Sequence, residues 1–235
     1  MDRGAIIRKL ASSLLLFDID GTLVRRAGPD HRQALEDAVR ETTGIPVSIA
    51  NIATQGMLDG EIIAVMLRQA GAAESLIEEA LPAIMEQAQC LYSGRCPDLR
   101  RRVCPGARSL LYRLSRRKVL MGLVTGNLSR IGWKKMERAG LRRYLHFGAF
   151  AESGRERRHL VANALSTARA EGWIDATSRV ALVGDHENDI LAAQANGIPI
   201  VSVATGLSPA ADLAKLRPDY LIDDLRSFPT QALGL

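Results

Sequence analysis

The chain has 235 residues, of which 47% are hydrophobic and 24% charged, the ordinary balance of a globular protein that can bury a substantial core. No apolar run approaches the roughly 18 to 20 residues that a bilayer-spanning helix needs. The sequence therefore excludes a membrane-spanning protein, and a cytoplasmic location is expected. Three cysteines without Cys-x-x-Cys spacing argue against a disulfide framework and against a zinc site.

The net charge of +5 and the pI near 9.4 raise the question of a nucleic-acid partner. The basic residues, however, form short clusters that are scattered along the chain. Aromatic residues, which would stack on the bases of a single strand, make up only 4%. We therefore expect solvated helix ends and no nucleic-acid partner.

The first predicted element is a buried strand that ends at two carboxylates. The apolar run Leu14 to Phe17 leads into Asp18, and Asp20 follows on the same side of an extended chain. Two like charges so close raise each other's pKa, so we expect a bound divalent cation or one retained proton. Gly21 allows a sharp bend, and Thr22 adds a hydroxyl and a backbone N–H. The alternative is a plain strand-ending turn, in which Asp and Gly are common.

Helical periodicity follows, and residues 25–104 are predicted to be all helical. Three helices are expected in this stretch, at 29–44, at 59–71 and from 73 to about 92. Asp59 opens the second helix, directly after Gly56-Met57-Leu58, and could serve there as a simple N-cap.

From Pro105 onwards the pattern alternates between strands and helices. Strands are expected at 119–124, 146–150, 180–183, 198–203 and 220–222. This alternation predicts a parallel, doubly wound α/β sheet. The strand that ends at Asp18 must belong to the same sheet, because a single buried strand cannot fold alone. We therefore predict an α/β core formed by residues 1–24 and 105–235, interrupted by a helical insertion over 25–104.

Polar residues follow the strand at 119–124, in the order Thr125-Gly126-Asn127. A Thr hydroxyl and neighbouring backbone N–H groups can hold phosphoryl oxygens, and the glycine lets the backbone approach closely. A strand-to-helix turn with a polar N-cap is the alternative. The position favours phosphate binding, because this strand and the one before Asp18 are predicted to share a sheet.

The strand at 180–183 leads through Gly184 to two further carboxylates, Asp185 and Asp189. In the first turn of a helix, positions i and i+4 share a face, so both can point towards one cation. A small number of hard oxygen ligands suits Mg²⁺. Asp185, at the strand end, is the better direct ligand, with Asp189 acting indirectly. Helix capping by Asp185 is the alternative.

These three segments resemble the first, second and fourth motifs of the haloacid dehalogenase superfamily, most of whose members are magnesium-dependent phosphatases. The insertion of 80 helical residues after the first strand resembles the helical cap of the phosphoglycolate phosphatase-like branch. The resemblance implies the following roles: nucleophile Asp18; general acid and base Asp20; phosphate-binding Thr22, Thr125, Gly126 and Asn127; Mg²⁺ ligands Asp18, the Asp20 carbonyl and Asp185, supported by Asp189.

Two further residues follow from the resemblance. The third motif is a cation, usually Lys, near the start of the helix before Asp185. Here that segment offers only arginines, of which Arg157 fits better than Arg155 or Arg158, because it precedes the first apolar residues of the helix by three positions. In the predicted cap, the segment ending at Asp59 resembles the Gly-x-Thr-Asp segment that related caps direct at the substrate, although Leu58 replaces the Thr. Asp59 is therefore a candidate substrate residue as well as a candidate N-cap.

The expected function is Mg²⁺-dependent hydrolysis of a small phosphorylated metabolite through an aspartyl phosphate. Asp18 attacks phosphorus, while Asp20, retaining a proton, donates it to the leaving alcohol and then activates water. A closing cap favours a small metabolite over a phosphoprotein. The acid at position 20 argues against a dehalogenase. A phosphomutase of the same superfamily and a noncatalytic nucleic-acid-binding protein on the same fold remain as alternatives.

Overall fold

The structure, a computed structural model, describes residues 10–25 and 29–235. Within them, six parallel strands form one sheet in the order β3-β2-β1-β4-β5-β6. The central strand β1 is buried along its whole length, and its Leu16 pairs with Gly122 on one side and Leu182 on the other. The predicted parallel α/β sheet is confirmed. The strands are β1 (Ser13–Phe17), β2 (Leu120–Val124), β3 (Phe147–Ala149), β4 (Arg179–Gly184), β5 (Ile200–Val203) and β6 (Tyr220–Ile222).

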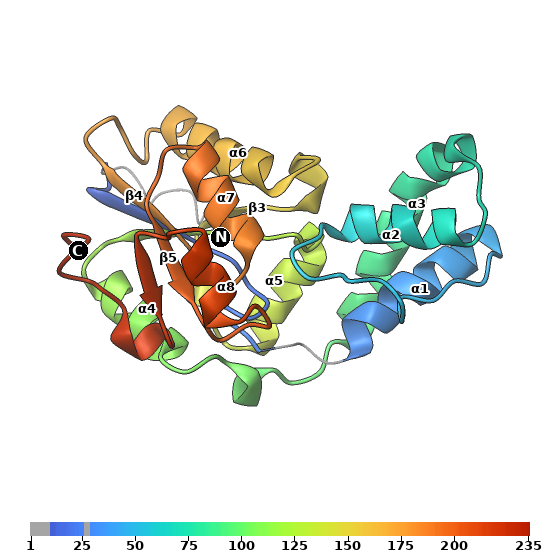
Figure 1. Cartoon of the computed structure of the whole chain (residues 1–235), viewed down its shortest axis with the longest axis horizontal. Helices are drawn as coiled ribbons and strands as arrows, with labels where there is room; N and C mark the ends of the chain where they lie inside the picture. The colour runs from blue at the N-terminus through green and yellow to red at the C-terminus, as the bar shows by residue number, and fades with distance from the viewer. Residues whose placement is uncertain (1–9, 26–28) are drawn as a thin grey trace, which may run out of the picture.

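Helices cover both faces of the sheet (Figure 1) because alternate side chains of each strand point to opposite sides. Leu14 and Leu16 of β1 pack in one apolar cluster with residues of α6 and α7. Leu15 and Phe17 pack in the other with residues of α4 and α5. The core helices are α4 (Ala107–Arg116), α5 (Ser129–Arg138), α6 (Arg157–Ala170), α7 (Glu187–Ala195) and α8 (Ala210–Lys215). Short 3₁₀ turns lie at Arg100–Arg102, Arg142–Tyr144, Ala151–Ser153 and Leu225–Ser227.

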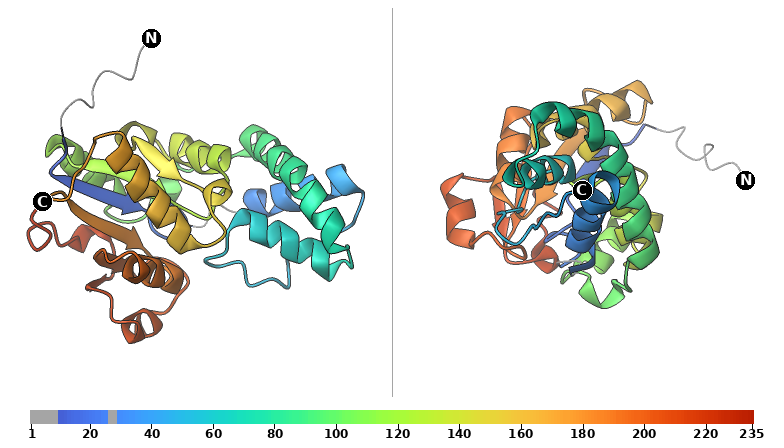
Figure 2. Two further views of the ribbon diagram at one scale, coloured as in Figure 1. Left: turned by 90° about the horizontal axis from the view of Figure 1, so that it is seen from above. Right: turned by 90° about the vertical axis from the view of Figure 1, so that its right-hand side faces the viewer.

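Three helices are inserted between β1 and β2, as the sequence predicted: α1 (Pro29–Thr43), α2 (Asp59–Gln69) and α3 (Glu74–Arg95). They gather beside one end of the sheet, and we call them the cap (Figures 1 and 2). Each contributes fully buried side chains to a shared apolar interior, among them Leu35, Ile63 and Tyr92. None of the helices in the described part of the chain is long and apolar enough to cross a membrane.

The two connections between cap and sheet lie side by side. The Arg25 N–H donates to the carbonyl of Arg102 at 2.7 Å, and Val24 forms an antiparallel bridge with Val103. Of the first connection, Arg25 is described, and residues 26–28 lie outside the described residues. The division into a core at 1–24 plus 105–235 and a cap at 25–104 stays a prediction.

The carboxyl ends of the parallel strands meet at the edge of the sheet nearest the cap (Figure 1). Asp18 follows β1, Thr125 follows β2 and Asp185 follows β4. Asp18 is thereby brought together with residues that lie more than one hundred positions later in the sequence.

Candidate active site

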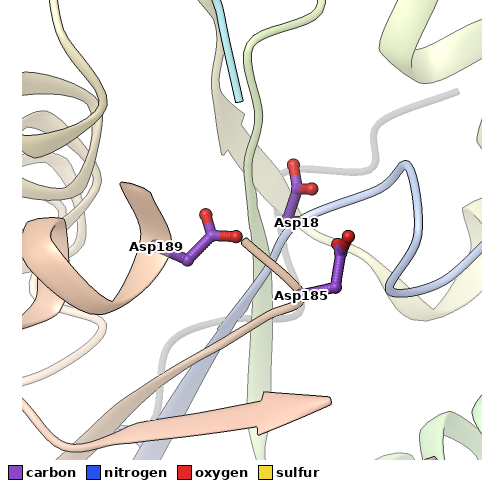
Figure 3. Close-up of side chains that lie close together, drawn as sticks. All are labelled: Asp18, Asp185 and Asp189. Atoms are coloured by element: carbon purple, nitrogen blue, oxygen red, sulfur yellow. The ribbon is translucent and has the colours of Figure 1, made fainter. Parts of the chain in front are cut away.

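Three buried aspartates converge at this edge. Oxygen atoms of Asp18, Asp185 and Asp189 lie within 4.8 Å of one another. Figure 3 shows the three carboxyl groups approaching one another from the end of β1, the end of β4 and the first turn of α7. The His186 side chain accepts from the Asn188 N–H at 3.1 Å while Asp189 Oδ2 accepts from the His186 N–H at 3.2 Å, so a capping box starts α7 and fixes Asp189.

The crowding of these carboxylates perturbs their proton affinity. Burial is the main cause that raises the pKa of Asp185 well above its ordinary value, and the charges of Asp18 and Asp189 raise it further. Burial likewise raises the pKa of Asp189 to about 7, although the Arg157 charge opposes this. Arg157 is close to this cluster, but its single charge does not offset the burial and mutual repulsion of the acids, and a divalent cation would supply the missing positive charge.

The surroundings fit such a cation. Oδ1 of Asp189 is buried without a hydrogen-bond partner among the described residues. Two glycines leave room for Asp185: a Cβ on Gly21 would lie 2.1 Å from Asp185 Oδ2, and one on Gly206 would lie 1.7 Å from it. Thr22 donates its hydroxyl to Asp185 Oδ1 at 2.8 Å and so orients the carboxylate. The donors are hard carboxylate oxygens, the ligand type that suits Mg²⁺.

Arg157 is the one of the three candidate arginines that reaches this cluster. Its Nη1 lies 2.8 Å from Asp18 Oδ1 and 3.3 Å from Asp189 Oδ1. Burial lowers the pKa of its guanidinium, but Asp189 and Asp18 more than compensate, so the group stays charged. Arg155 is exposed, and Arg158 pairs with Glu156 in solvent. Arg157 Nε is buried and has no hydrogen-bond partner in the described chain.

Asp20 is held by a residue that sequence reasoning missed, Lys135 of α5. The Lys135 ammonium donates to Asp20 Oδ2 at 2.6 Å and to Asn127 Oδ1 at 2.6 Å. Burial would raise the pKa of Asp20, but the charge of Lys135 and the hydrogen bonds from Lys135 and Asn127 outweigh it and hold the pKa below its usual value. The expectation that Asp20 retains a proton stays a prediction, since these contacts favour its carboxylate form. The acids with raised pKa are Asp185 and Asp189.

The predicted phosphate-binding residues divide into two groups. Thr125 and Asn127 are buried and line the same cavity as Asp18, and the Asn127 amide donates to both Thr125 Oγ1 at 2.6 Å and Asp20 Oδ2 at 2.8 Å. Gly126 also lines the cavity, but its carbonyl accepts from the Asp59 N–H at 2.8 Å. Thr22 instead contacts Asp185, as described above.

Asp59 joins the cap to the core. Its Oδ2 accepts from the Leu128 N–H at 2.8 Å and lies 3.1 Å from His31 Nε2. Leu58, not Asp59, occupies the N-cap position of α2, so the N-cap alternative is wrong. A cavity of about 1030 Å³ lies between cap and core, and Asp59 lines it together with Asp18, Asp20 and Arg157.

Comparison with known proteins agrees with this geometry. A family model described as haloacid dehalogenase-like hydrolase matches residues 13–197. The phosphoglycolate phosphatase of Agrobacterium fabrum is 29% identical over 221 residues, which cover 91% of this chain and 89% of the relative. The phosphoglycolate phosphatase of Vibrio cholerae is 24% identical over 220 residues, covering 90% and 93%.

Solved structures share the fold. A predicted phosphoglycolate phosphatase from Haemophilus somnus superposes with a TM-score of 0.68 at 20% identity, covering 96% of this chain and 99% of that one. A β-phosphoglucomutase from Clostridium difficile superposes with a TM-score of 0.72 at 18% identity, covering 96% of each chain. The chain therefore belongs to the haloacid dehalogenase-like hydrolases and is similar to phosphoglycolate phosphatases of that family.

Proposed function

We propose that the protein is a Mg²⁺-dependent phosphatase that hydrolyses a small phosphorylated metabolite through an aspartyl phosphate on Asp18. The single observation that carries this proposal is the buried cluster of Asp18, Asp185 and Asp189 with Arg157 in contact with the first and last of them. Asp18, the Asp20 carbonyl and Asp185 would hold Mg²⁺, with Asp189 in support. When bound, the ion neutralises charge on the phosphoryl oxygens.

Asp18 is the nucleophile in this proposal. An oxygen of its carboxylate attacks phosphorus as the bond between phosphorus and the leaving oxygen breaks, which gives an acyl phosphate and an alcohol. Water then attacks the same phosphorus and releases inorganic phosphate and the Asp18 carboxylate. Arg157, Thr125 and Asn127 bind the phosphoryl oxygens, and Arg157 keeps its charge throughout.

Asp20 carries the proton between the two steps. It starts as a carboxylate, because Lys135 favours its ionised form. A phosphate group that enters the cavity adds negative charge beside it and raises its proton affinity. Asp20 then takes up a proton from solvent, gives it to the leaving oxygen, and as a carboxylate again takes one from the attacking water.

The substrate is a small phosphorylated metabolite because the cap covers the site. The Asp59 N–H and carboxylate both bond to core backbone at 126 and 128, and the Asn188 amide donates to the Gly56 carbonyl at 2.9 Å. A phosphoprotein loop would have to displace these contacts. Phosphoglycolate, the substrate that the relatives' names give, is the first compound to test.

The test is release of inorganic phosphate from phosphoglycolate and from p-nitrophenyl phosphate, with and without Mg²⁺. We expect hydrolysis of both that requires Mg²⁺ and is lost in Asp18→Asn, a near-isosteric change that leaves the fold intact. Full hydrolysis by Asp18→Asn would refute the mechanism. Turnover of a sugar phosphate into its isomer without release of phosphate would mean that the protein is a phosphomutase.

A further inference from the structure

Lys135 is buried, with 1% of its side chain exposed, although it lies on the outer layer helix α5 beside the more exposed Lys134. A buried ammonium is costly unless its three protons find acceptors. Lys135 has three: Asp20 Oδ2 at 2.6 Å, Asn127 Oδ1 at 2.6 Å and His31 Nδ1 at 3.3 Å. These contacts use all three protons, so the ammonium is committed to protein partners and has none left for a substrate.

At the core end, Lys135 fixes the orientation of Asp20. Both Lys135 and the Asn127 amide donate to the same oxygen, Oδ2. Lys135 also holds the Asn127 carbonyl oxygen, which decides which end of that amide faces Asp20. The Asp20 side chain remains 36% exposed and lines the cavity. Because Oδ2 carries both contacts, Oδ1 is the oxygen that can meet a leaving group.

At the cap end, Lys135 is held by His31 of α1. Since His31 Nδ1 accepts from the ammonium, the ring proton lies on Nε2, and this proton is donated to Asp59 Oδ2 at 3.1 Å. The same Asp59 oxygen accepts from the Leu128 N–H of the core. The rings of His31 and Tyr92 of α3 pack in an edge-to-face arrangement, with 5.4 Å between ring centres. A continuous chain of contacts thus runs from three cap helices to Asp20.

We propose that Lys135 is the positioning residue of the reaction: it presents Oδ1 of Asp20 to the leaving group, and His31 with Asp59 hold it in place when the cap is docked. This inference rests on the proposed function, since it assigns a partner to the acid of that mechanism. Lys135 touches no reacting atom. Its effect is to make the alignment of the acid depend on the cap.

The consequence is a dependence on the leaving group. A nitrophenolate is stable enough to leave without a proton, whereas an alkoxide leaves readily only when an acid protonates it. A misplaced Asp20 therefore slows the hydrolysis of alkyl esters far more than that of activated aryl esters. The value of kcat/KM reports the first phosphoryl transfer for both substrates. The ratio of kcat/KM for an alkyl phosphate to that for p-nitrophenyl phosphate therefore measures how well Asp20 is placed.

The experiment measures this ratio in the full chain for wild type, Lys135→Met, Lys135→Arg and the control Lys134→Met. We expect Lys135→Met to lower the ratio by about 10²-fold, the size of a general-acid contribution. Lys135→Arg should restore part of it, and Lys134→Met should match wild type. Hydrolysis of p-nitrophenyl phosphate by each preparation shows that the variant is folded.

Three outcomes would overturn the inference while leaving the proposed phosphatase intact. They are an equal fall for both esters in Lys135→Met, an unchanged ratio, and a raised ratio, which would mean that the lysine only suppresses the acid. The proposed function itself fails if wild type hydrolyses neither ester with Mg²⁺.

The cap part of the inference is tested by His31→Phe, which keeps a ring beside Tyr92 but loses both nitrogens. It should lower the ratio in the same direction, and in Lys135→Met it should have no further effect.

Discussion

The Thr22 hydroxyl donates a hydrogen bond of 2.8 Å to Asp185 Oδ1, and both side chains are buried. The sequence grouped Thr22 with the phosphate-binding residues. The observed contact gives it a different task, because a carboxylate held by a hydroxyl keeps the orientation that a metal ligand needs. Thr22 thus orients the proposed Mg²⁺ ligand Asp185 through this hydrogen bond.

Replacing Thr22 with Val keeps the shape of the side chain and removes this bond. We expect the concentration of Mg²⁺ that gives half-maximal activity to rise by about 10-fold to 100-fold, the usual effect of losing a partner of a metal ligand. The KM for p-nitrophenyl phosphate at saturating Mg²⁺ should change little. A raised KM with an unchanged requirement for Mg²⁺ would return Thr22 to the phosphate site.

Arg157 contacts Asp18 and Asp189, whereas the neighbouring Arg155 and Arg158 do not. Arg157→Ala should therefore lower kcat/KM by about 10²-fold to 10³-fold, the effect of losing one preorganised donor to the transition state. Arg157→Lys should keep part of the activity, because a charge remains. Arg155→Ala and Arg158→Ala are the matched controls, measured with the same aryl phosphate. A small and equal loss in all three alanine variants would rule out the assigned role.

The parallel sheet, the helical insertion and most of the acidic cluster could be predicted from the sequence because they rest on local patterns. The predicted and observed ends of each buried strand differ by at most two residues, and those of the strand at Tyr220–Ile222 coincide. Strand ends in a parallel sheet share one edge, so Asp18 and Asp185 could be brought together without coordinates. Arg157 could be chosen because the apolar face of α6 begins three residues later.

Lys135 could not be found in this way. It lies in the segment Trp133-Lys134-Lys135-Met136, where both lysines read as the solvated face of a helix. Tertiary packing buries Lys135 between core and cap and leaves Lys134 half-buried. His31 is equally unmarked, since its partner Asp59 is 28 positions away. Contacts that cross between core and cap leave no local pattern in a single sequence.

The raised pKa values of Asp185 and Asp189 make the stability of the metal-free protein depend on pH. A carboxyl whose pKa is raised by folding binds its proton more tightly in the folded chain than in the unfolded one. Its contribution to stability is full at low pH and is lost as the pH rises from about 4, the unfolded value, towards the folded pKa of Asp189 of about 7. We expect the Tm without metal to fall across this range.

Mg²⁺ should reverse this fall, because it binds the deprotonated carboxylates. Thermal unfolding followed by circular dichroism, with EDTA or with Mg²⁺, measures both effects. The rise in Tm on adding Mg²⁺ should be larger near pH 8 than near pH 5. The variant Asp189→Asn removes one of the two carboxyls, and in EDTA its Tm should fall less steeply with pH. If the Tm in EDTA falls with pH as steeply in Asp189→Asn as in wild type, the raised pKa of Asp189 is contradicted.

The central claim is that Asp18 carries the phosphoryl group, and acid-quenched mass spectrometry tests it most directly. Protein is mixed with p-nitrophenyl phosphate and Mg²⁺, quenched in acid during turnover, digested and examined for the mass of one phosphoryl group on the peptide that contains Asp18. Asp20→Asn, which should slow release of phosphate from the intermediate, serves to increase its amount. We predict a label on Asp18 that requires Mg²⁺ and is absent in Asp18→Asn. Turnover with no label on this peptide, in wild type and in Asp20→Asn alike, would contradict the account.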